Sequence, residues 1–444
     1  MKNIRYYVFW TLDYLRGSPI RKYYKEIQTL FYNQEGAKEL QGKLLSDILN
    51  YAVTNTEYYA AYDPNDLESF PITNKATVLS NMDAMFSREY KHKKDTLKTM
   101  STSGSTGSPF KIYQCPNKEL RNKADVLFFY KTGGYYPGDR LYYMRIWTDM
   151  NKRSRKRLVE ENFRMFNTSN LDKEGAKSFV KTMTSDKSKK VLLGFPSSFS
   201  ALMEHIQDGR AIDWNIKTIL TQAEALPGAT KRKMQETFGC PVVAIYSNQE
   251  NGVLAQQPIT GEDYFELNTG SYFIEFLKLH SNEPAQEMEE ARIVVTDLFN
   301  KAVPLIRYDT EDVGVFVYHT NKDGTKRKVL NKIIGRQADY LYSNQGERLS
   351  PYILITMMWR HEGIKQCQII QEDFDKVTVK VVYNDANRKE KIQTELGKEL
   401  KQVFGEDTRV RFEVLDFIPV ASSGKRKYIV SKIDKKCTGT SLNV

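Results

Sequence analysis

One stretch of the chain consists almost entirely of residues that suit the binding of an anion. Nine of the ten residues from Ser101 to Phe110 are Ser, Thr, Gly or Pro. Glycines let backbone N–H groups approach an anion closely, and short hydroxyl side chains add further donors. The stretch therefore predicts a phosphate-binding loop, although its composition alone suits a surface loop or linker even better. No part of the chain matches the Walker pattern GxxxxGK[ST], which argues against a P-loop NTPase.

Residues that bind transition metals are scattered along the chain. The four cysteines and five histidines stand far apart, without a CxxC pair: Cys115, Cys240, Cys367, Cys437, His92, His205, His280, His319 and His361. This spacing argues against a zinc site or a disulfide framework and is typical of the reducing cytosol. We therefore expect a cytoplasmic protein without zinc.

The loop and five later segments resemble, in the expected order, the signatures of the adenylate-forming superfamily, the acyl-CoA synthetases and their relatives. The segments are TSGSTGSP (102–109), QAEALP (222–227), YSNQE (246–250), RYDTEDVG (307–314), IIGRQADYL (333–341) and PVASSGKRKYIV (419–430). Two stretches, 135–147 and 191–206, are similar to the phenylacetate–CoA ligase and coenzyme F390 synthetase branch. The closest kin implied by this resemblance are CapK-type proteins of polysaccharide clusters.

The resemblance implies a role for each matching residue. Those that would hold the β- and γ-phosphates of ATP are Thr102, Ser103, Gly104, Ser105, Thr106 and Gly107. Those that would surround the adenine, the ribose and the α-phosphate are Ala223, Glu224, Tyr246, Ser247, Asn248, Gln249, Asp312 and Arg336. The two catalytic residues would be Glu250, a ligand of Mg²⁺, and Lys425, which would neutralise charge on the α-phosphate and the attacking carboxylate.

Several positions depart from the family pattern. Ala338 replaces the first acid of the hinge, although Asp339 remains, and Glu311 replaces the usual glycine before Asp312. Gln249 replaces a Thr or Ser and offers an amide donor instead of a hydroxyl. Gly346 corresponds either to a glycine of the pantetheine channel or simply to the turn of a β-hairpin.

The elements that must position these residues alternate between strands and helices. Strands are predicted at 141–147, 189–195, 216–224 and 241–247, and helices at 197–209, capped by Ser197, and 228–239. This alternation predicts parallel βαβ units. The segments after residue 247 predict a β-rich, more antiparallel section. We expect an α/β protein with a large N-terminal AMP-binding domain, 1–335, and a small mobile α+β C-terminal domain, 336–444.

The N-terminal segment predicts an amphipathic helix. Ile4, Val8, Leu12 and Leu15 fall on one side of it, and we name these four residues the N-terminal stripe. The apolar run is too short to span a bilayer. We expect the helix to pack on the body of the protein; the alternative is weak contact with a membrane surface.

The net charge of +11 favours anionic partners, although it also describes a solvated basic surface. No nucleic-acid-binding pattern is present, so we expect no nucleic acid partner. The resemblance implies that ATP activates a carboxylic acid as an acyl-adenylate, with Mg²⁺, and that the acyl group passes to CoA. Two alternatives remain: an amine or hydroxyl acceptor, such as a sugar precursor of surface polysaccharide, and a non-catalytic relative that binds nucleotide.

Overall fold

The structure is a computed structural model that describes residues 3–32, 34–102, 110–147, 152–206, 209–321, 324–336, 341–349, 354, 357–358, 360–418 and 428–433. The chain divides into two compact units, which we describe separately. The first consists of Met1–Leu226, Thr230–Thr310 and Gly314–Ile333. The second consists of Pro227–Ala229, Glu311–Val313 and Ile334–Val444.

The centre of the first unit is a seven-stranded sheet with the order β4-β3-β5-β6-β7-β8-β9. Its strands are β3 (Arg140–Arg145), β4 (Phe163–Asn167), β5 (Lys190–Gly194), β6 (Ile216–Gln222), β7 (Val242–Asn248), β8 (Gly252–Gln256) and β9 (Glu266–Leu267). Neighbouring strands from β4 to β7 run parallel, whereas β7–β8 and β8–β9 pair antiparallel. The predicted α/β class with parallel βαβ units is confirmed.

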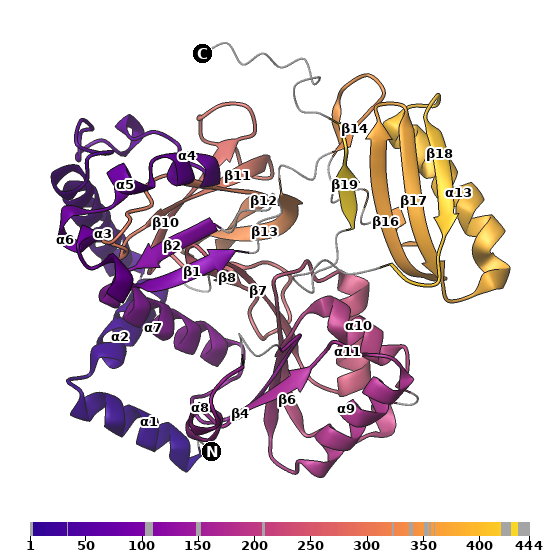
Figure 1. The fold of residues 1–444 in the computed structure, drawn as a ribbon, viewed down its shortest axis with the longest axis horizontal. Helices are drawn as coiled ribbons and strands as arrows, with labels where there is room; N and C mark the ends of the chain where they lie inside the picture. Colours follow the sequence, from indigo (N-terminus) through magenta and orange to yellow (C-terminus); the bar gives the residue numbers. More distant parts are fainter. Residues whose placement is uncertain are drawn as a thin grey trace. The chain divides into compact units, whose positions relative to one another are not determined.

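Helices cover both faces of this sheet (Figure 1). Val191 and Leu193 of β5 pack in a cluster with Ile27 of α2 (Pro19–Tyr32) and Phe128 of α7 (Pro116–Thr132). Leu192, on the opposite face, packs with side chains of α9 (Lys173–Ser185), α10 (Pro196–Met203) and α11 (Gly228–Phe238). A strand that is buried on both faces favours apolar residues on both, which explains the apolar run Val191–Leu193 of β5.

The helix predicted for residues 197–209 is shorter than expected. α10 ends at Met203, and Gly209–Ala211 form a separate 3₁₀ turn. A tertiary contact accounts for that turn, because the indole N–H of Trp214 donates to the Gly209 carbonyl oxygen at 2.8 Å. The glycine therefore serves as an anchor for a buried tryptophan and does not end the helix.

The remaining elements of the first unit surround the sheet. The other helices are α1 (Ile4–Leu15), α3 (Gln34–Asn55), α4 (Lys75–Ser80), α5 (Met82–Met85), α6 (Arg88–Lys91) and α8 (Arg155–Glu160). β1 (Lys98–Thr102) and β2 (Phe110–Gln114) form an antiparallel hairpin. A second sheet has the order β10-β11-β12-β13, with strands β10 (Tyr272–Lys278), β11 (Glu290–Asp297), β12 (Tyr308–Thr320) and β13 (Lys326–Arg336). This sheet is the β-rich section that the sequence predicts after residue 247.

The N-terminal helix α1 packs with a different face from the one we expected. Its buried residues are Trp10 and Asp13, and the Asp13 carboxylate accepts the N–H groups of Ile20 and Arg21 at the start of α2, each at 3.0 Å. The N-terminal stripe is exposed instead. The helix thus packs on the first unit as expected, but through an aromatic ring and a carboxylate that binds the next helix, and not through the N-terminal stripe.

The second unit is an α+β fold around a four-stranded sheet with the order β18-β17-β16-β19. Its strands are β16 (Ile364–Asp373), β17 (Lys376–Tyr383), β18 (Arg409–Val414) and β19 (Ile429–Ser431). β16 and β17 are antiparallel, whereas the two outer strands run parallel to their neighbours. α13 (Lys389–Phe404) contributes a stripe to the core of this unit: Ile392, Leu396, Leu400 and Phe404. A regular four-residue spacing places these side chains on one face of the helix.

A short hairpin belongs to the same unit. β14 (Leu341–Tyr342) and β15 (Arg348–Leu349) pair antiparallel, and Gly346 lies between them with φ +83°. The N–H of Gly346 donates to the Ser343 carbonyl oxygen at 2.9 Å. A positive φ favours glycine, so the hairpin alone is a sufficient reason for this residue.

Candidate active site

Two of the predicted nucleotide segments lie at the carboxyl ends of adjacent parallel strands. β6 ends at Gln222 and continues directly into residues 223–224, while residues 246–248 complete β7. Gln222 pairs with Ile245 across the two strands, so the two segments leave the sheet side by side. Ligands of open α/β sheets bind at this carboxyl edge.

Left-handed backbone conformations concentrate in the predicted nucleotide segments. Seven described residues other than glycine have a positive φ, and three of them are Ala223 (+67°), Arg307 (+46°) and Glu311 (+63°). These three lie in segments 222–227 and 307–314. A left-handed residue with a Cβ atom is disfavoured by about 1–2 kcal/mol. Such strain tends to occur at functional sites, and glycine would adopt the conformation of Glu311 more easily.

The side chain of Glu224 links the end of β6 to the start of α10. Its carboxylate accepts the N–H of Ser197 at 3.0 Å and the Ser197 hydroxyl at 2.9 Å. Pro196 occupies the first helical position, so Ser197 lies inside the helix and the cap predicted for it is wrong. The partial positive charge at a helix N-terminus favours a carboxylate there. The sequence missed this contact because its partners are 27 residues apart.

Glu250 lies in the tight turn between β7 and β8. Asn248 pairs with Gly252, and the N–H of Asn251 donates to the Asn248 side-chain oxygen at 2.8 Å. Glu250 is only 8% exposed, and its carboxylate accepts a long hydrogen bond of 3.5 Å from the Tyr308 hydroxyl. The turn therefore holds one nearly buried carboxylate at the same edge as residues 246–248.

A single carboxylate fits Mg²⁺, which commonly takes one or two protein carboxylates and completes its shell with phosphate oxygens and water. Within the described part of the chain, no group of three or more His, Cys, Asp or Glu residues could hold a metal ion. A Mg²⁺ ion at Glu250 would thus depend on the phosphates of a bound nucleotide.

A buried ionic group supports the turn that carries Glu250. Lys118 of α7 and Asp297 of β11 are fully buried and form an ion pair at 2.7 Å. The Lys118 ammonium also donates to the Tyr272 hydroxyl at 3.0 Å, and this hydroxyl donates to the Asn251 carbonyl oxygen. Burial raises the pKa of Tyr272 well above its usual value, so the phenol keeps the proton that it donates.

This ionic group was not among the residues predicted from the sequence. A signal was nevertheless present, since Lys118, Arg121 and Asp125 recur at helical spacing on one face of α7 and all three are buried. Charged residues are seldom buried unless they are paired. A helix face with three charges suggests an exposed surface when it is considered alone, which is why the pattern was overlooked.

The segment that contains Asp312 is held by two ion pairs. Arg307 contacts Glu275 at 2.9 Å, and Asp309 contacts Arg292 at 2.9 Å. Asp312 lies in β12, three residues after Asp309, and is partly exposed. Arg307 and Asp309 of the RYDTEDVG segment therefore stabilise the strand that carries the predicted ribose ligand.

The β1–β2 hairpin carries the predicted phosphate loop. Thr102, the last residue of β1, pairs with Phe110, the first residue of β2. The hairpin is attached to the body through Asn300, whose side-chain amide donates to the Tyr113 carbonyl oxygen at 3.0 Å. Five predicted phosphate ligands, Ser103, Gly104, Ser105, Thr106 and Gly107, lie outside the described residues, as does Lys425. Arg336 ends β13, and its side chain is not among those described.

The carboxyl edge of β3 also bears a polar group that the sequence analysis overlooked. The Gln222 amide donates to the Tyr143 hydroxyl at 2.7 Å. The Arg145 guanidinium lies over the rings of Tyr143 and Trp147, 5.6 and 5.3 Å from their centres. Its position at the end of a predicted strand was the available signal.

Comparisons with known proteins agree with this architecture. The family described as the CapK C-terminal domain matches residues 341–432. Protein CapK of Staphylococcus aureus is 24% identical over 432 residues, which cover 93% of each chain. The chain is therefore similar to protein CapK over nearly its whole length, in agreement with the resemblance that its motifs indicate.

Two further similarities concern acyl-CoA ligases. Phenylacetate-coenzyme A ligase of Aromatoleum evansii is 25% identical over 235 residues, which cover 50% of this CapK-like chain and 52% of the ligase. The crystal structure of 2-hydroxyisobutyryl-CoA ligase in the postadenylation state, in complex with R3-HIB-AMP, superposes with a TM-score of 0.72. That comparison covers 91% of both chains at 16% identity, and it supports the fold.

Proposed function

We propose that this chain activates a carboxylic acid with ATP and then transfers the acyl group to CoA. The observation that carries the proposal is the position of segments 222–227 and 246–250 at the carboxyl ends of adjacent strands. The relatives whose names specify CoA ligation support the same chemistry. In the first step a carboxylate oxygen of the acid bonds to the α-phosphorus of ATP, the bond to the β-phosphate oxygen breaks, and pyrophosphate leaves.

The proposed residues address the repulsion between two anions, the carboxylate and the triphosphate. Glu250 would hold Mg²⁺, which offsets phosphate charge, and Lys425 would add positive charge beside the α-phosphate. Tyr246 would stack on the adenine, and Asp312 would accept the ribose hydroxyls. Donors and charges that are fixed before the reaction stabilise such a transition state efficiently.

In the second step the CoA thiolate would attack the acyl carbon and AMP would leave. An amine or hydroxyl acceptor is the alternative, because 93% of the chain aligns with protein CapK, whose name specifies no CoA chemistry. Gly346 does not distinguish the two acceptors, since its hairpin accounts for the residue without CoA.

A panel of carboxylic acids tests the proposal by measurement of pyrophosphate release with ATP and Mg²⁺, with and without CoA. We expect at least one acid to give release that depends on both ATP and the acid, and CoA to accelerate turnover. Release that CoA does not affect would favour an amine or hydroxyl acceptor. Nucleotide binding by calorimetry without release for any acid would indicate a non-catalytic relative and contradict the proposal.

A further inference from the structure

The N-terminal helix exposes an unusual amount of apolar surface. Ile4, Val8, Leu12 and Leu15, the N-terminal stripe, are 78%, 51%, 46% and 72% exposed, and Tyr7 and Tyr14 are exposed beside them. These six residues are nearly half of the fourteen large exposed hydrophobic side chains in the described part of the chain. A contiguous apolar patch of this kind usually marks an interaction surface.

The stripe cannot turn inward without loss of buried contacts. The opposite side of α1 holds Trp10, whose ring packs on Tyr24 of α2 with centroids 5.4 Å apart. Asp13 binds the first N–H groups of α2, and Asn3 donates to the Asp139 carboxylate at 3.3 Å. The helix is therefore held at both ends, and its apolar side remains on the outside of the first unit.

Exposed charges on the first two helices are all basic. Among described residues 3–32 there are five basic and two acidic side chains, a net charge of +3. Both acids are occupied: Asp13 is buried, and Glu26 forms an ion pair with the buried Arg121. With about 3.6 residues per turn, Arg5 and Arg16 flank the stripe on the same side.

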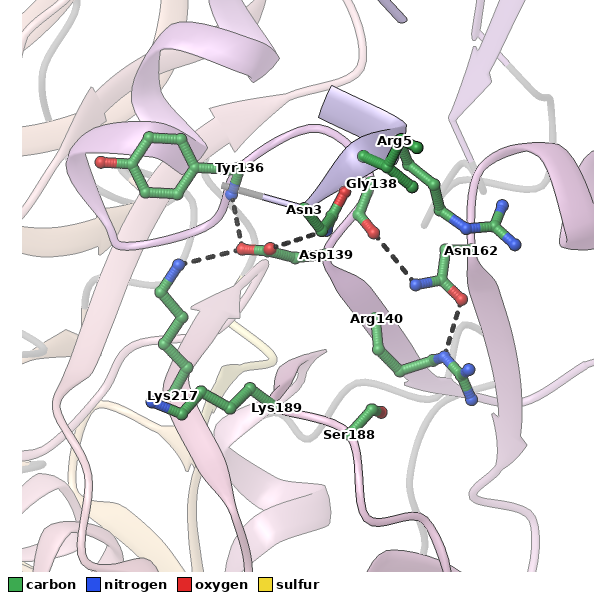
Figure 2. A pocket seen from close by; sticks show the side chains of 11 residues that line it. Asn3, Arg5, Tyr136, Gly138, Asp139, Arg140, Asn162, Ser188, Lys189 and Lys217 are labelled. Atoms are coloured by element: carbon green, nitrogen blue, oxygen red, sulfur yellow. Dashed lines mark hydrogen bonds and ion pairs between the residues drawn. The ribbon is translucent and has the colours of Figure 1, made fainter. Parts of the chain in front are cut away.

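A basic hollow adjoins the start of the stripe (Figure 2). Its volume is about 620 Å³, and Ile4 belongs both to its lining and to the stripe. Four basic side chains and one acidic side chain line it: Arg5, Arg140, Lys189, Lys217 and Asp139. Lys217 binds Asp139 at 3.0 Å and Arg140 binds Asp186 at 2.7 Å, whereas the Arg5 guanidinium donates to the Val159 carbonyl oxygen. The lining therefore keeps an excess of positive charge.

We propose that α1 lies on the surface of an anionic lipid bilayer, with the N-terminal stripe at the level of the acyl chains. Arg5, Arg16 and the basic hollow would face the lipid phosphates. This combination of an apolar helix face with flanking basic residues is typical of helices that lie in a membrane interface. Within the described residues, no helix is long and apolar enough to cross a bilayer, and α1 has only 12 residues.

The proposed docking surface leaves the candidate active site accessible. Three residues that line the hollow lie at the starts of parallel strands: Arg140 begins β3, Lys189 precedes β5, and Lys217 is the second residue of β6. The predicted nucleotide segments follow the last residues of β6 and β7. Because these strands run parallel, their first residues lie along one side of the sheet and their last residues lie along the opposite side. Membrane binding and catalysis are thus separable, and either can fail without the other.

Sedimentation with lipid vesicles tests this inference. We expect the full chain to bind phosphatidylcholine vesicles that contain about one third phosphatidylglycerol, and to bind pure phosphatidylcholine vesicles much more weakly. Leu12→Glu should lower the partition coefficient at least about tenfold, because it removes a leucine that the bilayer would bury and adds a charge. The matched control is Leu79→Glu on α4, since Leu79 is 44% exposed and Leu12 is 46% exposed; it should leave binding unchanged.

The basic component has its own test. Arg16→Glu with Lys189→Glu should weaken binding to the anionic vesicles by more than about tenfold, and added salt should reduce binding of the wild type. Equal effects of Leu12→Glu and Leu79→Glu, or binding that is indifferent to phosphatidylglycerol, would overturn the proposal. So would a dimer in light scattering that Leu12→Glu converts to a monomer without a change in vesicle binding, because the occupant of the stripe would then be a second copy.

Discussion

At the scale of single residues, the proposed site depends on Glu250, a nearly buried carboxylate that, among the described residues, accepts a long hydrogen bond from Tyr308. Burial of a carboxylate ion is unfavourable when its partner is as weak as this one, so the contact with Tyr308 alone gives little structural reason for the residue. A cation that approaches the carboxylate would offset that penalty. We therefore propose that the carboxylate oxygens serve ligand chemistry more than the fold.

Glu250→Gln should lower the rate of pyrophosphate release by about 10²–10³-fold, because the neutral amide is a much poorer ligand of Mg²⁺. The amide can still accept the Tyr308 hydrogen bond, so the melting temperature should hardly change. Tyr308→Phe is the control, since it removes the hydroxyl that donates to Glu250 at 3.5 Å but keeps the carboxylate, and it should alter the rate by less than about tenfold. Equal losses in both variants would mean that the turn has a structural role only.

Glu311 has φ +63° in the segment that leads to Asp312. Glu311→Gly should unfold at a higher urea concentration than Glu311→Ala, with a difference of about 1 kcal/mol, because only alanine keeps the Cβ atom that disfavours this backbone. Both variants lose the same side-chain contacts, so their difference isolates the backbone conformation. Equal stability of the two would show that the left-handed conformation is not maintained in solution.

At the scale of elements, strands and helices of the central sheet were predictable because their buried faces dictate a local pattern. β5, β6 and β7 appear in the sequence as apolar runs. The motifs that come directly after β6 and at the end of β7 could therefore be placed at the ends of these strands. The outward face of α1 and the cap that Glu224 forms on α10 were not predictable. Each depends on a partner distant in the sequence, and local spacing contains no information about that partner.

The ion pair of Lys118 and Asp297 joins α7 to β11 inside the first unit. Lys118→Met should lower the free energy of unfolding by about 3–5 kcal/mol, because Asp297 would remain buried and uncompensated. Urea titration followed by tryptophan fluorescence measures this change. Adding Asp297→Asn to Lys118→Met removes the unpaired charge and should restore part of the stability. A double variant no more stable than Lys118→Met would contradict the electrostatic explanation.

Asp186 connects the end of α9 to β3, and its stability contribution depends on pH. Burial opposes ionisation, but hydrogen bonds from Ser188 and Tyr142 and the charge of Arg140 lower its pKa from 3.8 to about 2. A lowered carboxyl pKa stabilises the folded state above the unfolded value and loses this contribution as the pH falls from about 4 to about 2. Asp186→Asn should thus destabilise the protein by about 1 kcal/mol at neutral pH.

Urea titrations of Asp186→Asn and the wild type at about pH 7, 4 and 3 measure this dependence, and the difference between the two proteins should shrink at the lowest pH. Tyr142→Phe is a control that removes one donor and keeps the carboxylate. The loss of unfolding free energy should be smaller than that of Asp186→Asn, and the stability of Tyr142→Phe should still fall as the pH drops from about 4 to about 2. A difference that is constant with pH would indicate that Asp186 acts through its shape and hydrogen bonds alone.

At the scale of the whole molecule, the proposed reaction needs residues from both parts of the chain. Residues 222–226 and 246–250 at the carboxyl ends of the strands belong to the first unit, whereas Asp312 and Lys425 fall within the ranges of the second. We propose that domains 1–335 and 336–444 cooperate in this way, with the second domain needed in a different arrangement for each half-reaction. Such a division predicts that a residue of the second domain can affect one step and not the other.

Lys425→Ala separates the two half-reactions. Its proposed role is to neutralise charge where the carboxylate meets the α-phosphate, so its loss should slow pyrophosphate release by about 10²–10³-fold. Turnover of a chemically prepared acyl-adenylate to product should stay near the wild-type rate, because that step contains no attack on phosphorus. Lys427→Ala is a matched control, since it removes one charge from the same basic segment and should leave both steps nearly unchanged. Equal losses in both steps would mean that Lys425 stabilises the second domain or takes part in both steps. No loss in either step would mean that SSGKRK is only a solvated basic segment.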